Sequence, residues 1–148
     1  MKAISIIFIT VFIYSCNQKP NNLPIIGFQE KQEDGSINYH KIPPFSFSNQ
    51  NGEIIDNESF KDKIYIADFF FTSCPSICPK VMKQMMRIAD AQKDNDNFML
   101  ISHTIDPKRD NIDVLKKYAN NLGVDQKKWH FLTGDKDNLL DMADEYYV

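Results

Sequence analysis

The residues of this 148-residue chain that could do chemistry are Cys74 and Cys78, in the segment TSCPSICPK. Two thiols four positions apart can close a disulfide or hold one soft metal ion, because residues four apart lie on the same face of a helix. Thiolates without nearby carboxylates select soft or borderline metals such as Cu(I) over Mg²⁺ or Ca²⁺. Pro75 and Pro79, each directly after a cysteine, stiffen the segment. The spacing therefore predicts a redox-active or metal-binding pair.

The segments on either side of the pair predict a strand followed by a helix. Residues 64–71, IYIADFFF, form a nearly continuous apolar run that is typical of a strand buried on both faces. Apolar residues then recur at helical spacing, at Val81, Met82, Met85, Met86 and Ala89. Open α/β folds place ligands at the carboxyl end of a parallel strand, and a helix start favours thiolates. We therefore expect both cysteines to react or bind metal near neutral pH.

The remaining hydrophobic pattern alternates between strands and helices. Downstream it predicts strands at residues 98–106 and 129–133, and helices at residues 110–122 and from residue 135 onward. Upstream, Asn51 and Gly52 between two short apolar runs predict an N-terminal β-hairpin. The order β-α-β-α-β-α from residue 64 onward predicts an α/β fold, a three-layer α/β/α sandwich around a largely parallel sheet.

The N-terminus predicts export and attachment to a membrane. Residues 1–15 carry one positive charge and an apolar run shorter than the roughly 20 residues that span a bilayer, which is typical of a signal peptide. The segment IYSC resembles the lipobox of bacterial lipoproteins, so Cys16 is expected to be acylated, although an ordinary cleaved signal remains the alternative. Residues 16–41 are polar and predict a tether, and residues 42–148 the folded domain. We expect a membrane-anchored lipoprotein that faces the periplasm or the cell exterior.

Composition and charge restrict the class of protein. The chain is 43% hydrophobic and 25% charged, as in ordinary globular domains. With 17 Lys and Arg against 20 Asp and Glu, the net charge of -3 disfavours a nucleic-acid partner. The three cysteines are too few for a disulfide scaffold and odd in number. One lipid anchor and one reactive pair account for all three.

The segment TSCPSICPKVMKQM, followed by ISHTIDPKRDNIDVLKKYANNLG, resembles the Sco/SenC family of thioredoxin-fold copper proteins. The resemblance runs from about Phe45 to Tyr147 and implies a thioredoxin-like fold. It also implies that Cys74 and Cys78 bind a copper ion and can switch between dithiol and disulfide. The implied partners are the copper-site subunit of cytochrome c oxidase and other copper chaperones or thiol reductants.

This chain departs from the family pattern in its third copper ligand. The family completes the site with a histidine from a hairpin that lies beyond the last expected helix, and no residue up to Val148 matches it. We therefore expect the domain to be incomplete, without its C-terminal hairpin and helix, and the histidine to come from beyond Val148. His103, in the strand at residues 98–106, is a weak substitute because a histidine there is more often a core residue.

Other polar and sulfur-containing residues near the pair favour structural roles. The three methionines of the helix after the pair predict core packing rather than a thioether copper site. Asp106, Arg109 and Asp110 match a family motif, and we expect a carboxylate–guanidinium pair and a helix cap from them.

Three functions are compatible with these residues. The first is a membrane-tethered copper chaperone that uses Cys74 and Cys78. The second is a thiol-disulfide oxidoreductase of the periplasm that stores no metal. The third is a non-functional fragment. The C-x-x-x-C spacing with two prolines favours the chaperone, because dedicated oxidoreductases use C-x-x-C.

Overall fold

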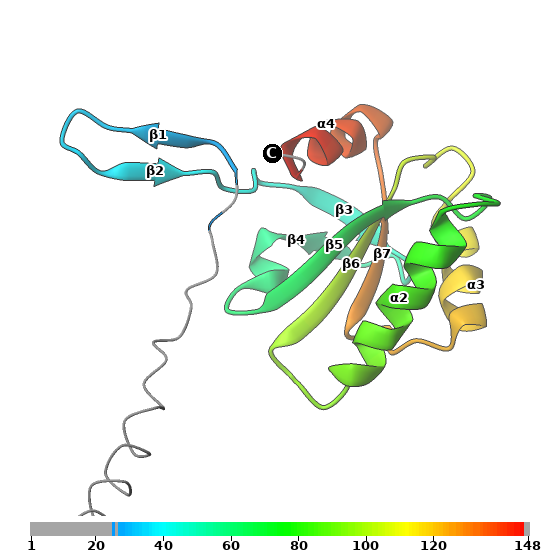
Figure 1. Ribbon diagram of the computed structural model, residues 1–148. Coiled ribbons are helices and arrows are strands. Elements are labelled where there is room, and N and C mark those ends of the chain that lie inside the picture. Colours follow the sequence, from blue (N-terminus) through cyan, green and yellow to red (C-terminus); the bar gives the residue numbers. More distant parts are fainter. Residues whose placement is uncertain (1–24, 26, 147–148) are drawn as a thin grey trace, which may run out of the picture. The chain divides into compact units, whose positions relative to one another are not determined.

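The computed structural model describes residues 25 and 27–146. The chain divides into two compact units, the first up to His40 and the second from Lys41 onward. The predicted signal peptide and Cys16 lie outside the described residues. Both Cys74 and Cys78 belong to the second unit, which also contains all of the described helices (Figure 1).

The described part of the first unit is a short hairpin. Strands β1 (Gln29–Lys31) and β2 (Ile37–Tyr39) pair antiparallel, and the Asp34 carboxylate accepts hydrogen bonds from the backbone N–H and hydroxyl of Ser36 in the turn. This stretch was expected to be a polar tether, and the hairpin was not predicted because all six strand residues are exposed and show no apolar alternation. The dipeptide Asp34-Gly35, with Gly35 at φ +84°, is the signal that could have revealed it.

The second unit is built on a five-stranded sheet with the order β4-β3-β7-β6-β5. Its strands are β3 (Ser46–Asn49), β4 (Ile54–Asp56), β5 (Ile64–Phe70), β6 (Phe98–Thr104) and β7 (Trp129–Thr133). Its helices are the 3-10 helix η2 (Asn57–Phe60), α2 (Cys78–Ala91), α3 (Ile112–Leu122) and α4 (Lys136–Tyr146). Strands β5, β6 and β7 are parallel, whereas β3 is antiparallel to β4 and β7. The predicted N-terminal β-hairpin is confirmed as β3–β4. The sheet was expected to be largely parallel but is mixed, parallel over β5, β6 and β7 and antiparallel where the hairpin joins it.

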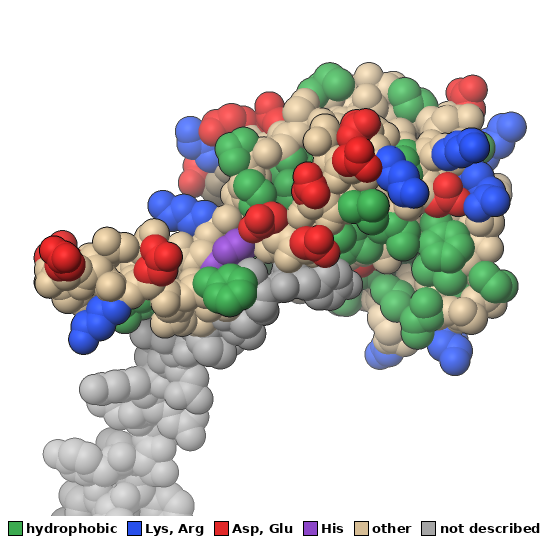
Figure 2. All heavy atoms as spheres, turned by 90° about the horizontal axis from the view of Figure 1, so that it is seen from above, with side chains coloured by type: hydrophobic (Ala, Val, Ile, Leu, Met, Phe, Trp, Pro, Cys, Tyr) green, Lys and Arg blue, Asp and Glu red, His purple; other side chains and the backbone are tan. Residues whose placement is uncertain are grey.

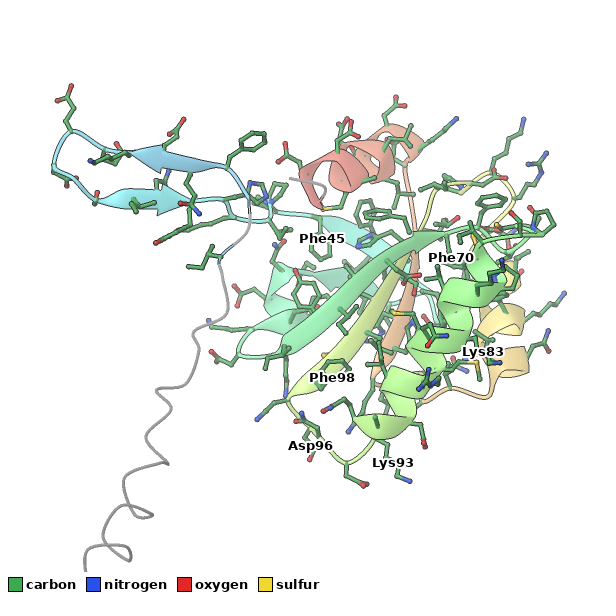
Figure 3. The ribbon with its side chains drawn as sticks, in the orientation of Figure 1. Phe45, Phe70, Lys83, Lys93, Asp96 and Phe98 are labelled. Carbon is green, nitrogen blue, oxygen red and sulfur yellow. The ribbon has the colours of Figure 1, made fainter. Side chains whose placement is uncertain are left out.

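Two hydrophobic cores separate the unit into three layers. One core lies between the sheet and helices α2 and α3 and contains Phe70, Leu100, Met82, Leu115 and Phe131. The other lies between the opposite face and α4 and contains Phe45, Phe47, Ile101, Leu132 and Leu139. Figures 1 and 3 show α2 and α3 on one side of the sheet and α4 on the other. The predicted three-layer α/β/α sandwich is therefore confirmed.

Strand β5 differs from its prediction. A strand buried on both faces was expected. Both faces do pack against a core, with Ile66 on one side and Tyr65 and Phe69 on the other, but most residues of β5 are only half-buried and the strand forms one edge of the sheet. Ile64 at its start is 69% exposed, and only Phe70 at its end is fully buried. The apolar run reflects contacts with the two cores, and the local sequence carries no information on which strands lie alongside.

The side chain of Gln50 extends the pairing between the β3–β4 hairpin and β7. Strand β3 pairs with β7 only at its last two residues, Ser48 and Asn49. Beyond that point, Gln50 donates from Nε2 to the carbonyl of Trp129 (3.0 Å) and accepts at Oε1 from the N–H of Phe131 (2.8 Å). Gln50 is 1% exposed, so this amide supplies the partners of two backbone groups that water does not reach.

Replacing Gln50 is therefore expected to destabilise the fold. Gln50→Ala leaves two buried backbone groups of β7 without partners, which costs about 2–4 kcal/mol. Urea denaturation of the variant measures this loss. The matched control is Gln84→Ala on the exposed side of α2, for which a change within about 0.5 kcal/mol is expected. Equal losses for the two variants would contradict this role.

Candidate metal and redox site

The two cysteines occupy the turn between β5 and α2. The backbone N–H of Cys74 donates to the carbonyl of Phe71 (3.1 Å), and α2 begins at Cys78 with Pro79 in its first turn, where the missing N–H costs nothing. The N-cap residue Ile77 provides no side-chain cap. Instead, the N–H of Cys78 donates to the sulfur of Cys74 (3.4 Å). The first thiol thus occupies the position of a capping group.

Both thiols are free and almost covered. Cys74 is 8% exposed and Cys78 is 7% exposed. The two side chains also belong to the same hydrophobic core as Met82 of α2. The predicted proximity of the pair is therefore seen in the fold.

The surroundings make the two thiols electrostatically unequal. The pKa of Cys74 is lowered to about 7, first by the hydrogen bond from the Cys78 thiol and then by the backbone N–H groups of Ser76, Cys78 and Ile77. The pKa of Cys78 is raised, first by burial and then by the same hydrogen bond to Cys74. The expectation that both thiols would be acidic is therefore correct only for Cys74. As pH rises through neutrality, the pair therefore loses its first proton from Cys74, while Cys78 keeps its own.

The buried carboxylate of Asp110 fixes the cysteine turn to the sheet. Asp110 is fully buried and accepts hydrogen bonds from the backbone N–H of Thr72 (3.0 Å), the hydroxyl of Thr72 (2.5 Å) and the hydroxyl of Thr104 (2.6 Å). Thr72 lies two residues before Cys74, and Thr104 ends β6. This carboxylate therefore joins the end of β6 to the turn that carries the first thiol.

Two structural roles predicted for the loop before α3 are seen. Arg109 pairs with Asp106 at 2.8 Å, and the N-terminus of α3 is capped by a side chain. The capping residue is Asn111, which accepts from the N–H of Val114 (3.0 Å). Asp110 was expected to share in that cap, and its link to the cysteine turn was not foreseen. No local pattern distinguishes the two roles, because the partners of Asp110 lie in other segments of the chain.

A second carboxyl group, the half-buried Asp68, lies on the strand that leads to the pair. It accepts a hydrogen bond from the hydroxyl of Ser102, and that hydroxyl accepts from the indole N–H of Trp129 (2.9 Å). Burial raises the pKa of Asp68 to about 6, and its charge contributes to the raised pKa of Cys78. Asp68 was not predicted to belong to the site, although an acidic residue inside the apolar run IYIADFFF was a visible signal.

The structure does not bring His103 to the cysteines. The imidazole is fully buried in the core on the α4 side of the sheet, against the rings of Phe45, Phe47 and Phe69 at centroid distances of 5.8, 5.6 and 5.2 Å. The cysteines belong to the other core. Within residues 25 and 27–146, no group of three or more His, Cys, Asp or Glu side chains is arranged to hold a metal ion. The same residues contain no helix long and apolar enough to cross a membrane.

Comparisons with known proteins identify the family. The SCO1/SenC family model matches residues 33–148, which is most of the chain. The chain belongs to the SCO1/SenC family. The SCO1 protein homolog of Bacillus subtilis is 38% identical over 99 residues, which cover 66% of this chain and 51% of that protein. This SCO1/SenC chain spans about half the length of the Bacillus subtilis protein and of a SCO2-like protein of Rickettsia prowazekii.

Solved structures of the family share the fold. BsSco, a Sco family cytochrome c oxidase assembly protein with an identified disulfide switch, is 34% identical with a TM-score of 0.65, over 72% of this chain and 63% of that one. A SCO1/SenC family lipoprotein from Bacillus anthracis is 26% identical with a TM-score of 0.67, over 72% and 64%. Copper-bound ScoI from Bradyrhizobium japonicum is 28% identical with a TM-score of 0.63, over 71% and 66%. The thioredoxin-like fold implied by the resemblance is confirmed.

The role of Asp110 gives a prediction for stability. Asp110→Asn replaces an acceptor with an amide that cannot accept all three hydrogen bonds, and we expect a loss of about 2–4 kcal/mol in the free energy of unfolding. We also expect faster hydrogen exchange at the N–H of Thr72. Asp106→Asn is the control, because Asp106 pairs with an exposed arginine and its loss should cost less than about 1 kcal/mol. A protected Thr72 amide in Asp110→Asn would contradict the assignment.

The unequal thiols give a prediction for pH dependence. A lowered pKa means that the reactive thiolate of Cys74 is present above about pH 7, so its alkylation rate should rise with a midpoint near that pH. In Cys78→Ala the midpoint should move up, because the largest stabilising contact is lost. Cys78→Ser, which keeps a hydroxyl donor, should give an intermediate value. Peptide-resolved mass spectrometry measures each rate, and a wild-type midpoint at the ordinary thiol value of about 8.5 would contradict the prediction.

Proposed function

We propose that this protein is a membrane-tethered copper-binding metallochaperone that helps to assemble the copper site of cytochrome c oxidase. The observation that carries the proposal is the pair itself: two neighbouring, nearly covered thiols, with the Cys78 N–H donating to the Cys74 sulfur. Membership of the SCO1/SenC family supports the proposal, as do the copper-bound ScoI and the description of BsSco as an oxidase assembly protein.

Copper is the cargo in this proposal, and Cys74 and Cys78 are its ligands. Thiolates suit Cu(I), and the soft, buried setting of the pair excludes competing hard cations. Binding must displace the proton of Cys78, whose pKa is raised, so the affinity for copper should increase with pH. The third ligand that the family resemblance implies is a histidine from beyond Val148. His103 is left out of the proposed site because it lies in the other core.

A second candidate function, thiol-disulfide exchange, is favoured by the inequality of the thiols. The thiolate of Cys74 attacks a disulfide of the partner protein and releases one partner thiolate. Cys78 then loses its proton and attacks the sulfur of Cys74, which closes the Cys74–Cys78 disulfide and releases the second partner thiolate. The partner gains the two electrons that the dithiol loses. BsSco, in which a disulfide switch is identified, supports this chemistry as an accompaniment or an alternative to copper binding.

The N-terminal segment supplies the proposed anchor. Residues 1–15 would be removed as a signal peptide, and Cys16 would become the acylated first residue of the mature protein. Residues 16–41, which include the β1–β2 hairpin, would hold the domain of residues 42–148 away from the membrane surface. The Bacillus anthracis family lipoprotein supports this arrangement. The proposed partners are the oxidase copper-site subunit and copper chaperones or thiol reductants on the outer side of the membrane.

Anaerobic Cu(I) titration against a chromogenic chelator tests the proposal. We expect Cys74→Ala and Cys78→Ala each to weaken binding at least about 100-fold, because each removes a direct ligand. Cys16→Ala is the matched control: it should keep full affinity and lose only recovery in the membrane fraction. Unchanged affinity for Cu(I) in the Cys74→Ala, Cys78→Ala double variant would contradict the copper proposal. Turnover of a disulfide substrate by a wild-type protein that binds no copper would favour the second candidate.

A further inference from the structure

A hollow of about 310 Å³ opens beside the cysteines, between α2 and α3. Cys74 and Cys78 form part of its wall, and the rest is largely apolar, with Pro79 and Met86 from α2 and Leu122 from α3. Because each thiol is less than a tenth exposed, a partner that reaches the sulfurs must contact the groups around this hollow. The lining favours an apolar side chain as the group that enters.

A basic stripe borders the hollow along α2. Lys80, Lys83 and Arg87 follow each other at intervals of three and four residues, which places them on one side of the helix, and Lys83 also lines the hollow (labelled in Figure 3). All three are exposed, and in the described part of the chain none forms an ion pair with a carboxylate. Arg87 donates only to the neutral amide of Gln84 (2.8 Å).

This stripe contrasts with the charges elsewhere on the protein. The whole chain has a net charge of -3, and α4 carries four acidic residues against one lysine. On the right-hand side of Figure 2, where α2 and α3 lie, hydrophobic side chains gather, and Lys and Arg outnumber Asp and Glu at the margin. An acidic partner is therefore attracted to the α2 side and repelled by α4.

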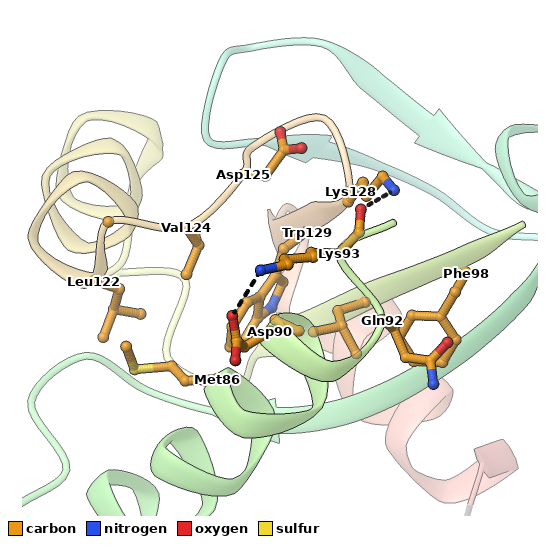
Figure 4. Close-up of a pocket in the computed structure, with 13 residues that line it drawn as sticks. Met86, Asp90, Gln92, Lys93, Phe98, Leu122, Val124, Asp125, Lys128 and Trp129 are labelled. Carbon is orange, nitrogen blue, oxygen red and sulfur yellow. Dashed lines mark hydrogen bonds and ion pairs between the residues drawn. The ribbon is translucent and has the colours of Figure 1, made fainter. Parts of the chain in front are cut away.

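A second hollow, beside the C-terminal end of α2, lacks unpaired lysine or arginine side chains. This hollow of about 300 Å³ is also largely apolar, and it shares Met86 and Leu122 with the first (Figure 4). Its lysines, however, are engaged: Lys93 pairs with Asp90 at 3.9 Å, and Lys128 pairs with Asp96 at 3.2 Å. Of these two hollows in the described part of the chain, the one next to the cysteines combines apolar walls with unpaired cations.

We propose that the hollow and the stripe of Lys80, Lys83 and Arg87 form the docking surface for a polypeptide segment with an apolar side chain flanked by Asp or Glu. The apolar side chain seats in the hollow, and the carboxylates lie against the stripe. This places a sulfur of the same segment next to Cys74. The inference rests on the proposed function, since it describes how a partner of the cysteine pair is recognised. Charge complementarity of this kind acts mainly on the rate of encounter.

Activated peptides test the surface directly. Three peptides each carry one cysteine as a pyridyl disulfide beside a leucine, with flanks of Glu, Ser or Lys. The thiolate of Cys74 attacks the peptide sulfur, forms a mixed disulfide and releases thiopyridone, which is measured by absorbance. The protein is the full reduced chain with Cys16→Ala. We expect the Glu peptide to react about 10-fold or more faster than the Lys peptide at low ionic strength, with the advantage shrinking as salt is added.

Matched variants separate docking from thiol reactivity. The triple variant Lys80→Glu, Lys83→Glu, Arg87→Glu should reverse the order of the Glu and Lys peptides. The control triple Lys61→Glu, Lys127→Glu, Lys136→Glu makes the same change in net charge at exposed sites elsewhere and should keep the order. Each rate is divided by that for dithiodipyridine, a neutral reagent that reports intrinsic reactivity. Replacing the peptide leucine with serine should slow the Glu peptide several-fold, because the hollow then gains no apolar occupant.

The outcomes distinguish this inference from the proposed function. Equal normalised rates for the Glu and Lys peptides, or an equal effect of the two triple variants, would overturn the docking surface. A dimer that dissociates only in the Lys80, Lys83, Arg87 triple variant would also overturn it, in favour of a second copy of this chain as the occupant. Failure of Cu(I) binding in the same preparation would refute the metallochaperone proposal. It would not change what the peptide rates say about the docking surface, because those rates are measured without copper.

Discussion

The buried carboxylate of Asp110 is the constraint on which the cysteine turn depends. A fully buried charge is stable only where hydrogen bonds replace water, and Asp110 accepts three, two from Thr72 and one from Thr104. Strands β5 and β6 are parallel, so their carboxyl ends meet at the same edge of the sheet. The carboxylate of Asp110 joins these two ends through Thr72 and Thr104, and Cys74 follows two residues after Thr72. These hydrogen bonds thereby fix the turn that carries the reactive thiol to the sheet.

The fixed geometry of the turn explains why the two thiols differ in pKa. The pKa of Cys74 is lowered because its sulfur accepts from the Cys78 thiol and from N–H groups at the start of α2, whereas the pKa of Cys78 is raised by desolvation and by its hydrogen bond to Cys74. A second thiolate beside the first is unfavourable until a cation arrives or the pair is oxidised. Both proposed activities use this same property, because copper binding and disulfide formation each remove the proton from Cys78.

The local parts of this site could be predicted from sequence, and the long-range parts could not. The strand, turn and helix around Cys74 and the hairpin at Asn51-Gly52 depend on neighbours in the chain, and the structure has them where expected. The edge position of β5 and the contacts of Gln50 and Asp110 depend on segments far away in sequence. These contacts leave no periodic signal, so only the folded arrangement reveals them.

The central claim is that Cys74 and Cys78 together hold copper through their sulfurs. X-ray absorption at the copper edge, on the full chain loaded anaerobically with Cu(I), tests this claim most directly because it reports the atoms bound to the metal. We expect the nearest shell to be dominated by sulfur and to lose its sulfur in the Cys74→Ala, Cys78→Ala double variant. A wild-type shell of nitrogen or oxygen alone, or a sulfur shell that persists in the double variant, would contradict the account.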